Sequence, residues 1–287
     1  MKYAKLSLPN LIISTTLLMA SVCILPVRAE TIDCTAITSL PYTITAQGVY
    51  CFTGNLSTSM ASGNAITINT NNVTLDLNGY KLGGLGAGDG TGTLGIYAGQ
   101  KRNITIKNGI VRGFYIGIWL HAGSPYVSSS GHVVTGILAD QNTLIGIQVA
   151  GFGNTVSNNT VVDTGGSTIN YDAYGILVHG NGAKVVNNDI SKTTAQITGI
   201  AYGMQIISAN YSLVQNNTVT DTIEDTGTSY AIYIGNSEGV FLRNNNLANA
   251  DNGLYFTVSG TGKYFNNLTF DATTAFTGGT AIGGNNN

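Results

Sequence analysis

Charged side chains are scarce in this sequence and make up 9% of its residues. If the basic N-terminal segment discussed below is removed, nine basic side chains remain against fourteen acidic ones, which gives a formal charge of −5. Such a chain offers little attraction to the phosphates of nucleic acid, so we expect no nucleic-acid partner. The low charge does not indicate disorder, because Ile, Val, Leu and Tyr recur along the whole chain.

Long hydrophobic runs are also missing after the first thirty residues. The one apolar stretch, Leu11 to Leu25, follows Lys2 and Lys5 and precedes Ala29. This order is typical of a secretory signal peptide over residues 1–29. An uncleaved membrane anchor is the alternative, but the stretch is shorter than the roughly 20 apolar residues that a span needs. We therefore predict a secreted or periplasmic protein without a membrane span after signal removal.

Cysteine is limited to three residues, and Cys23 falls within the signal segment. An exported chain that keeps Cys34 and Cys51 is expected to join them in a disulfide, because its compartment is oxidising. A redox-active pair is the alternative, but it would favour the close C-x-x-C spacing that this pair lacks. We predict an N-terminal cap over residues 30–54 that is clamped by the Cys34–Cys51 bond.

Helical periodicity and linker-like segments are absent, whereas two short motifs repeat. The first is Gly or Ala followed by an aliphatic residue, spaced by 22 to 29 residues: Gly95-Ile96, Gly117-Ile118, Gly146-Ile147, Gly175-Ile176, Gly203-Met204, Ala231-Ile232 and Gly253-Leu254. The second is an asparagine pair: Asn158-Asn159, Asn187-Asn188, Asn216-Asn217 and Asn245-Asn246. A repeat of this length built from short β-type runs indicates a stacked solenoid.

These repeats predict an all-β chain folded as a single-stranded right-handed parallel β-helix, with T-loop insertions on its central coils. Aliphatic side chains fill the narrow core, and Asn and Gly occupy corners that need a left-handed backbone. The asparagine pairs are expected to stack into amide ladders along the axis. We place the β-helix at residues 55–270 and a C-terminal cap or tail at residues 271–287.

Two segments resemble the repeats of the pectate-lyase-like β-helix superfamily. They are Asn72 to Gly79, which reads NVTLDLNG, and Asn103 to Gly109, which reads NITIKNG. The resemblance covers roughly residues 55 to 270 and implies the fold. The superfamily contains polysaccharide lyases, glycoside hydrolases, uronate epimerases and noncatalytic proteins, so its membership alone does not imply one activity.

Strand alternation predicts which side chains face solvent beside the Gly-Ile motif. The residue after each motif points outward and yields a column that is rich in aromatic and amide groups: Tyr97, Trp119, Gln148, Leu177, Gln205, Tyr233 and Tyr255. Aromatic rings stack on sugars and amides bind their hydroxyl groups, so we predict substrate binding by Tyr97, Trp119, Gln148, Gln205 and Tyr255. The alternative is ordinary strand propensity, which also favours exposed tyrosine and tryptophan.

The next outward column contains His121 and His179, two coils apart. We predict that one of them acts as a catalytic base and that Tyr233 supplies a proton. Loops at Gly165 to Ala173, Thr193 to Ala201, Ile223 to Ser229 and Ala122 to Gly131 would form the walls of a cleft. Asp172 is predicted to join the catalytic group and Asp140 to reach the cleft, although either could be a turn residue.

Other charged side chains are assigned away from this cleft. Asp163, Lys192 and Asp221 share one column and are expected to form a surface ion-pair ladder. Arg112 and Arg243 are not placed on the aromatic side. No acidic cluster has the spacing of a calcium site, so we predict no metal and no other cofactor.

The residues thus favour an exported protein that acts on an acidic polysaccharide by metal-independent lyase or epimerase chemistry, before hydrolysis. A noncatalytic glycan-binding or structural surface protein is the alternative. The polysaccharide or other glycan is the expected partner, and the oligomeric state is not predicted.

Overall fold

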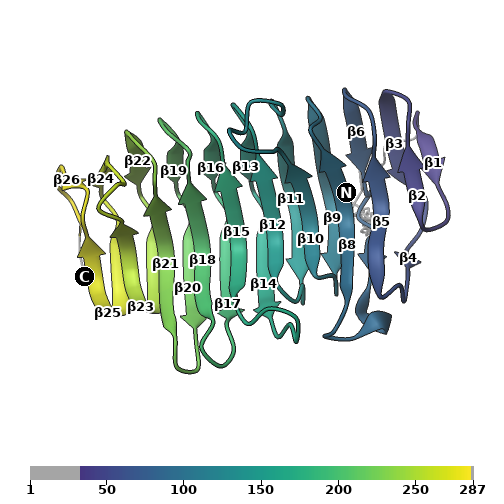
Figure 1. Ribbon diagram of the computed structural model, residues 1–287. Coiled ribbons are helices and arrows are strands. Elements are labelled where there is room, and N and C mark those ends of the chain that lie inside the picture. Colours follow the sequence, from purple (N-terminus) through teal and green to yellow (C-terminus); the bar gives the residue numbers. More distant parts are fainter. Residues whose placement is uncertain (1–32, 286–287) are drawn as a thin grey trace, which may run out of the picture.

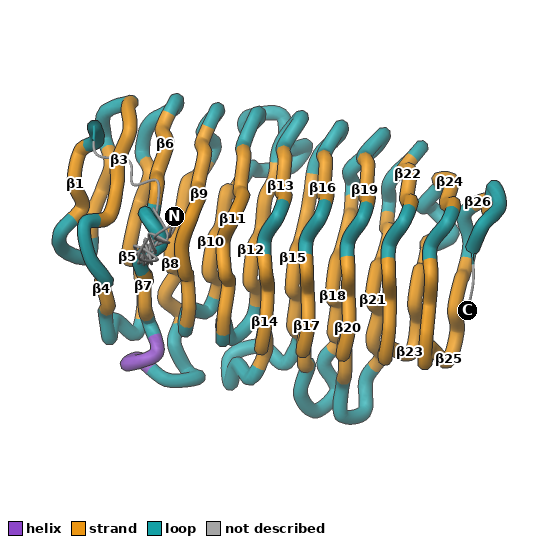
Figure 2. The backbone as a smooth tube through the Cα atoms, turned by 180° about the vertical axis from the view of Figure 1, so that it is seen from behind, coloured by secondary structure: helices purple, strands orange, loops and turns teal. Residues whose placement is uncertain are grey.

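The computed structural model describes residues 33–285, so the predicted signal peptide lies outside the described residues. Its 26 strands pair in parallel and form successive coils of one solenoid, with β1 and β26 at opposite ends (Figures 1 and 2). The predicted parallel β-helix is therefore confirmed. A single turn of 3-10 helix, Leu85–Ala87, interrupts the strands of the described chain.

Each coil contributes strands to three ladders that run along the solenoid. The first ladder contains β2 (Tyr42–Ile44), β5 (Ser62–Ile68), β8 (Gly92–Gly99), β10 (Ile116–His121), β12 (Ile145–Ala150), β15 (Ala173–His179), β18 (Ile200–Ile207), β21 (Thr228–Gly235) and the later parts of β23 (Asn246–Phe256) and β25 (Leu268–Thr277). This ladder contains the Gly-Ile motifs.

The second ladder contains β1 (Thr35–Ile37), β3 (Gly48–Phe52), β6 (Val73–Asp76), the first parts of β9 (Ile104–Arg112) and β11 (Val133–Asp140), β13 (Thr155–Ser157), β16 (Lys184–Val186), β19 (Leu213–Gln215), β22 (Val240–Arg243), β24 (Gly262–Phe265) and β26 (Thr280–Ala281). The third contains β4 (Leu56–Ser57), β7 (Lys81–Gly83), β14 (Thr160–Gly165), β17 (Asp189–Thr194), β20 (Thr218–Ile223) and the remaining parts of β9, β11, β23 and β25.

The strand ladders extend beyond the predicted range of residues 55–270 at both ends. Strands β1 to β3 already pair with later coils, so residues 35–52 belong to the solenoid and not to a separate cap. At the other end β25 continues the coil to Thr277. The predicted Cys34–Cys51 disulfide is confirmed and joins the first strand region to β3.

A continuous aliphatic core runs along the axis between the ladders. The motif residues Ile96, Ile118, Ile147, Ile176 and Met204 are all fully buried, as alternation predicts. Their stacking places one inward side chain per coil at each core position.

The asparagine ladders are confirmed, with one correction of register. Asn217 Nδ2 donates to Asn245 Oδ1 at 3.0 Å, and the exposed Asn244 donates to Asn216 Oδ1 at 3.2 Å. The fourth pair is therefore Asn244-Asn245 and not Asn245-Asn246. The sequence has three consecutive asparagines here, so either register was consistent with it. The hydrogen bonds join residues 28 apart and select Asn244-Asn245. The inner ladder continues through Asn267 to Asn285.

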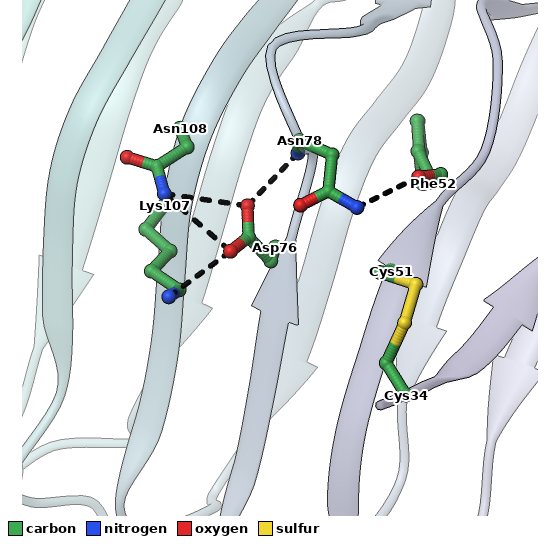
Figure 3. Close-up of polar contacts among 7 residues, drawn as sticks. All are labelled: Cys34, Cys51, Phe52, Asp76, Asn78, Lys107 and Asn108. Atoms are coloured by element: carbon green, nitrogen blue, oxygen red, sulfur yellow. Dashed lines mark hydrogen bonds and ion pairs between the residues drawn. A yellow bond between two sulfur atoms is a disulfide. The ribbon is translucent and has the colours of Figure 1, made fainter. Parts of the chain in front are cut away.

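The Asp76 carboxylate organises the polar corner near the disulfide (Figure 3). Its side chain is 1% exposed and pairs with Lys107 Nζ at 3.0 Å. The same carboxylate accepts a hydrogen bond from the Asn78 backbone at 2.8 Å, and Asn78 Nδ2 donates to the Phe52 carbonyl at 3.1 Å. The acidic residue of the NVTLDLNG segment therefore joins adjacent coils and lies on the second ladder.

Candidate functional site

The predicted outward column is present in the first ladder. Strand register aligns, from coil to coil, Thr67, Tyr97, Trp119, Gln148, Leu177, Gln205, Tyr233, Tyr255 and Thr277. We call the outward side of strands β8 to β23 the aromatic face. Exposure differs along it, because Leu177 and Gln205 are 6% and 9% exposed whereas Tyr97, Trp119 and Gln148 are half-buried.

A bend at the motif glycine adds a column that strict alternation did not predict. A Cβ built on Gly175 would lie 2.6 Å from Ile190 Cγ2 in the core, so Gly175 and Ile176 both face inward. Tyr174 consequently points outward instead of into the core. The register extends this column to Tyr202 and Tyr230. A tyrosine before the motif at intervals of 28 residues was the available sequence signal.

Five tyrosines form one cluster on the C-terminal half of the aromatic face. Tyr174, Tyr202 and Tyr230 stack at centroid distances of 5.0 and 5.4 Å, with planes 11° apart. Tyr233 and Tyr255 stack at 5.6 Å and meet the first row edge-on. Within each row the ring planes are nearly parallel, and the two rows meet at 63° to 76°, so the rings of the cluster contact one another by both faces and edges.

The hydroxyl groups of Tyr202 and Tyr233 in this cluster keep their protons at neutral pH. Burial raises the pKa of Tyr202, with the neighbouring Tyr233 adding to the effect. Burial likewise raises the pKa of Tyr233, helped by Tyr255. Protonated phenols can donate hydrogen bonds, so the cluster offers donors at intervals close to the coil spacing.

A second aromatic group lies toward the N-terminal half of the face. The Trp119 ring meets Tyr97 at 5.4 Å and His121 at 4.9 Å, both edge-to-face. Trp119 also packs against an apolar cluster outside the main core that includes Ile116, Ile145 and Leu177. These contacts fix the indole ring on the surface of the sheet beside His121.

His179 lies at the same end of the strands as His121 and is covered by a loop. The Tyr126 ring stacks on the imidazole at 4.9 Å, with planes 23° apart. Burial, with the neighbouring His121 adding to the effect, lowers the pKa of His179 to about 4. The imidazole of His179 is therefore neutral in the physiological range, and its Nδ1 has no hydrogen-bond partner.

Asp172 is placed at the opposite end of β15 from His179. Its carboxylate accepts hydrogen bonds from the Ile200 backbone at 2.8 Å and from the Tyr174 hydroxyl at 3.2 Å. The seven residues of β15 separate these two ends by about 20 Å. Tyr233 lies two coils from His179, or about 10 Å between backbones. The structure thus brings His121 and His179 to one end of the face and holds Asp172 at the other.

Loops flank both ends of the strands on the aromatic face. Residues 166–172, 195–199 and 224–227 precede β15, β18 and β21, whereas residues 122–132 follow β10. In Figure 1 the first three project together at the bottom and the last bends over the top edge.

Asp140 does not reach the aromatic face. Its carboxylate pairs with Arg112 Nε at 3.0 Å on β9, because both residues lie on the third ladder. The prediction for Asp140 was wrong, since sequence proximity to Gln148 does not place it on the same side of the coil. Arg243 is on β22 and donates to Gln215 at 2.7 Å, so both arginines lie off the aromatic face as expected.

The proposed ion-pair ladder forms only in part. Lys192 Nζ lies 3.7 Å from Asp163, and both side chains are exposed. Asp221 instead accepts a hydrogen bond from Asn249 at 2.8 Å. All four residues have φ between 52° and 54° and occupy one left-handed corner, so the backbone position rather than charge explains the column.

The third histidine, His132, is 1% exposed and structural. Its Nδ1 accepts a hydrogen bond from the Ile104 backbone at 3.2 Å, and Nε2 lies 2.6 Å from Ser129 Oγ. The Ser129 hydroxyl donates to the Lys101 carbonyl at 2.8 Å. Because the serine proton and the basic imidazole nitrogen are both engaged, this pair links coils and is not a nucleophile with its base.

Within residues 33–285 no helix is long and apolar enough to cross a membrane. The same part of the chain contains no group of three or more His, Cys, Asp and Glu side chains arranged to hold a metal ion.

Comparisons with known proteins identify the fold without a family. No protein-family model and no curated protein sequence matches the chain. Among solved structures, the Dettilon tailspike protein aligns with a TM-score of 0.54 at 11% identity, over 82% of this chain and 54% of the tailspike. The enzymatically active domain of bacteriophage CBA120 tailspike protein 2 aligns with a TM-score of 0.58 at 16% identity, over 86% of this chain and 38% of that one. Pectate lyase Pel9A aligns with a TM-score of 0.48 at 12% identity, over 83% of this chain and 69% of the lyase.

The two tailspike similarities confirm the right-handed parallel β-helix fold. The chain spans about half or less of the two tailspike chains.

Proposed function

We propose that this chain is an exported carbohydrate-active protein that binds a polysaccharide lengthwise along the aromatic face. The register of that face is the observation that carries the proposal. Apart from Leu177, each coil from β8 to β23 presents an aromatic or amide side chain at one position, including Trp119, Gln148 and Tyr233. Side chains spaced by about 4.8 Å can meet successive units of an extended glycan chain.

The chemistry of the face also suits sugars. Protonated tyrosine hydroxyls and the Gln148 amide can bind sugar hydroxyls, while the Trp119 indole offers an apolar surface. The disulfide between Cys34 and Cys51 supports export, because such bonds persist in oxidising compartments. Tailspike proteins share the fold, and one aligned domain is described as enzymatically active. The site's side chains, rather than the fold, support the proposal for this chain.

A panel of acidic and neutral polysaccharides tests this proposal by calorimetric binding to the mature protein. We expect Tyr233→Phe combined with Tyr255→Phe to weaken binding about tenfold, because each lost hydroxyl removes one hydrogen bond of roughly 0.5–1.5 kcal/mol. Trp119→Ala should weaken binding at least as much. Tyr211→Phe is the matched control, since Tyr211 is an exposed tyrosine in the turn between β18 and β19. Equal binding by all variants, or binding of no polysaccharide, would refute the proposal.

Metal-independent elimination or epimerisation of an acidic polysaccharide is a second candidate. The grouping of Trp119, His121 and His179 at one end of the strands favours it. A neutral imidazole could remove the proton beside a uronate carboxylate, and the protonated Tyr233 hydroxyl could serve as a donor. Asp172 would contribute indirectly at most, because its carboxylate holds the Ile200 backbone and the Tyr174 hydroxyl.

Two measurements test this chemistry. Elimination creates an unsaturated uronate with ultraviolet absorbance, and epimerisation exchanges the sugar C5 proton with deuterium from the solvent. We expect His121→Gln and His179→Gln to abolish either signal while binding persists. Turnover that both substitutions leave unchanged would exclude the histidines as the catalytic bases.

A further inference from the structure

The loop between β10 and β11 places one ring on the histidine end of the aromatic face. Tyr126 stacks on His179, which lies 53 residues later in the sequence. The loop is anchored at both ends: the His121 carbonyl accepts a hydrogen bond from Gln100, and Ser129 Oγ donates to the Lys101 carbonyl. Between these anchors, the Tyr126 N–H bonds within the loop itself, to the Gly123 carbonyl at 2.7 Å. Tyr126 can therefore move without breaking a strand pair.

A small side chain lies beside His179 in the same outward column. Ala150 lies between His121 and His179 in their outward column, on the coil that separates the two histidines. Its methyl group is the only side chain in the column between the two imidazoles. Val149 faces the core, and alternation directs Ala150 outward. An outward methyl that is only 1% exposed must be covered by neighbouring side chains. Tyr126 stacks on His179, the neighbour of Ala150 in this column.

Two polar atoms in the same patch lack partners. Trp119 Nε1 and His179 Nδ1 are both buried and make no hydrogen bond. The indole N–H is a hydrogen-bond donor and an imidazole nitrogen can donate or accept, so both atoms can pair with the hydroxyl groups of a ligand. The two atoms come from β10 and β15, which pair with β12 on its two sides.

We propose that Tyr126 is a removable cover over a subsite for a single pyranose ring, formed by Trp119, His121, Ala150 and His179. In the bound state the sugar ring takes the place of the tyrosine ring on His179, and its hydroxyl groups pair with Trp119 Nε1 and His179 Nδ1. A pyranose fits because it combines a ring of similar size with hydroxyls that both donate and accept hydrogen bonds. The inference rests on the proposed function, since the subsite continues the polysaccharide-binding face.

Tyr126→Ala tests this cover, with Tyr211→Ala as its matched control. Both tyrosines have a left-handed backbone, with φ of 66° and 56°, so alanine is equally strained at the two positions. We expect Tyr126→Ala to bind the polysaccharide identified by the panel about 2- to 10-fold more tightly, because the sugar no longer competes with one aromatic stack. Tyr211→Ala should bind like the wild type.

A second readout reports on the cover without any ligand. The pKa of His179, about 4 in the covered state, should rise toward the ordinary histidine value in Tyr126→Ala when followed by NMR through its ring protons. The groups that act on this imidazole are Tyr126 by stacking, His121 by charge and the Ile207 backbone by hydrogen bonding, so the Tyr211 control should leave its pKa unchanged.

The outcomes separate the two proposals. Tighter binding together with a raised His179 pKa supports the cover. Weaker or unchanged binding by Tyr126→Ala, while the wild type binds, would show that Tyr126 is part of the binding surface or unconnected with it, and would overturn the cover alone. An unchanged His179 pKa would also overturn it. Failure of every polysaccharide to bind either protein would instead refute the proposed function.

Discussion

Replacement of Asn217 by leucine should destabilise the solenoid far more than replacement of its neighbour Asn216 by glycine. The Asn217 side chain is 1% exposed and makes four hydrogen bonds between coils. Its Nδ2 donates to the Val185 carbonyl at 2.9 Å and to Asn245 at 3.0 Å. Its Oδ1 accepts from the Asn188 backbone at 2.9 Å and from the Asn188 side chain at 3.0 Å.

The cost follows from the groups that leucine would leave unpaired. Leucine preserves the approximate shape of asparagine but accepts no hydrogen bond, so the Asn188 backbone N–H and one of its amide N–H groups lose their partner in a buried site. Each orphaned donor costs about 1–3 kcal/mol. We therefore expect a loss of about 3–5 kcal/mol in the free energy of unfolding.

Asn216 provides the internal control. It belongs to the exposed ladder and has φ of 55°, so Asn216→Gly removes its amide while keeping the left-handed backbone accessible. Water can replace the lost partners, and the expected change is below about 1 kcal/mol.

Urea denaturation followed by circular dichroism measures both variants. Hydrogen exchange at the Asn188 amide adds a local readout that does not depend on two-state unfolding of a long solenoid. The reasoning would be refuted if Asn217→Leu lost less than 1 kcal/mol, or if the Asn188 amide stayed as protected as in the wild type.

Three further perturbations follow from the described contacts. Burial lowers the pKa of His132 to about 4, so below pH 6.5 the unfolded chain binds a proton that the folded chain excludes. The free energy of unfolding should therefore fall by about 3 kcal/mol as the pH drops from 6.5 to 4. Denaturation curves taken across this pH range should show that His132→Asn removes this share of the loss. Gly109→Ala would place a Cβ 2.7 Å from the Tyr80 carbonyl oxygen and against Leu77, so we expect the free energy of unfolding to fall by about 1–3 kcal/mol. The control Gly54→Ala places a Cβ that meets nothing within 4 Å and should be nearly neutral. Equal urea midpoints for the two variants would contradict the packing argument. Replacing Cys34 and Cys51 together by serine opens a loop with a sequence separation of 17 and should cost about 3 kcal/mol, detectable as a lower melting temperature that matches that of the reduced wild type.

The sequence was sufficient to predict the solenoid because every coil repeats the same physical requirements. An inward aliphatic side chain follows each motif glycine, and corners at Asn158, Asn187 and Asn216 have φ between 55° and 57°. Each requirement is local, so the short motif that meets it recurs along the sequence and indicates a stacked solenoid. The register of the outward column from Tyr97 to Tyr255 follows from the same rule and was predicted correctly.

The details of the site depended on contacts that no local pattern records. The bend at Gly175 places two consecutive residues inward and moves Tyr174 to the surface, where strict alternation would have buried it. The stacking of Tyr126 on His179 joins a loop to a strand two coils away. Asp172 was correctly assigned to a loop beside the face, but the length of β15 places it at the far end from His179.

Because the first ladder keeps one register, each coil adds one step of equal length to the aromatic face. Strand pairing joins each coil of this ladder to the next one, as between β15 and β18, so one whole repeat of 28 residues could be removed or duplicated with the pairing pattern of the ladder intact. Such a change would shorten or lengthen the face by one step while leaving its cross-section unchanged. Under the proposed function, the number of coils thus sets how many consecutive units of a bound polysaccharide the aromatic face can contact.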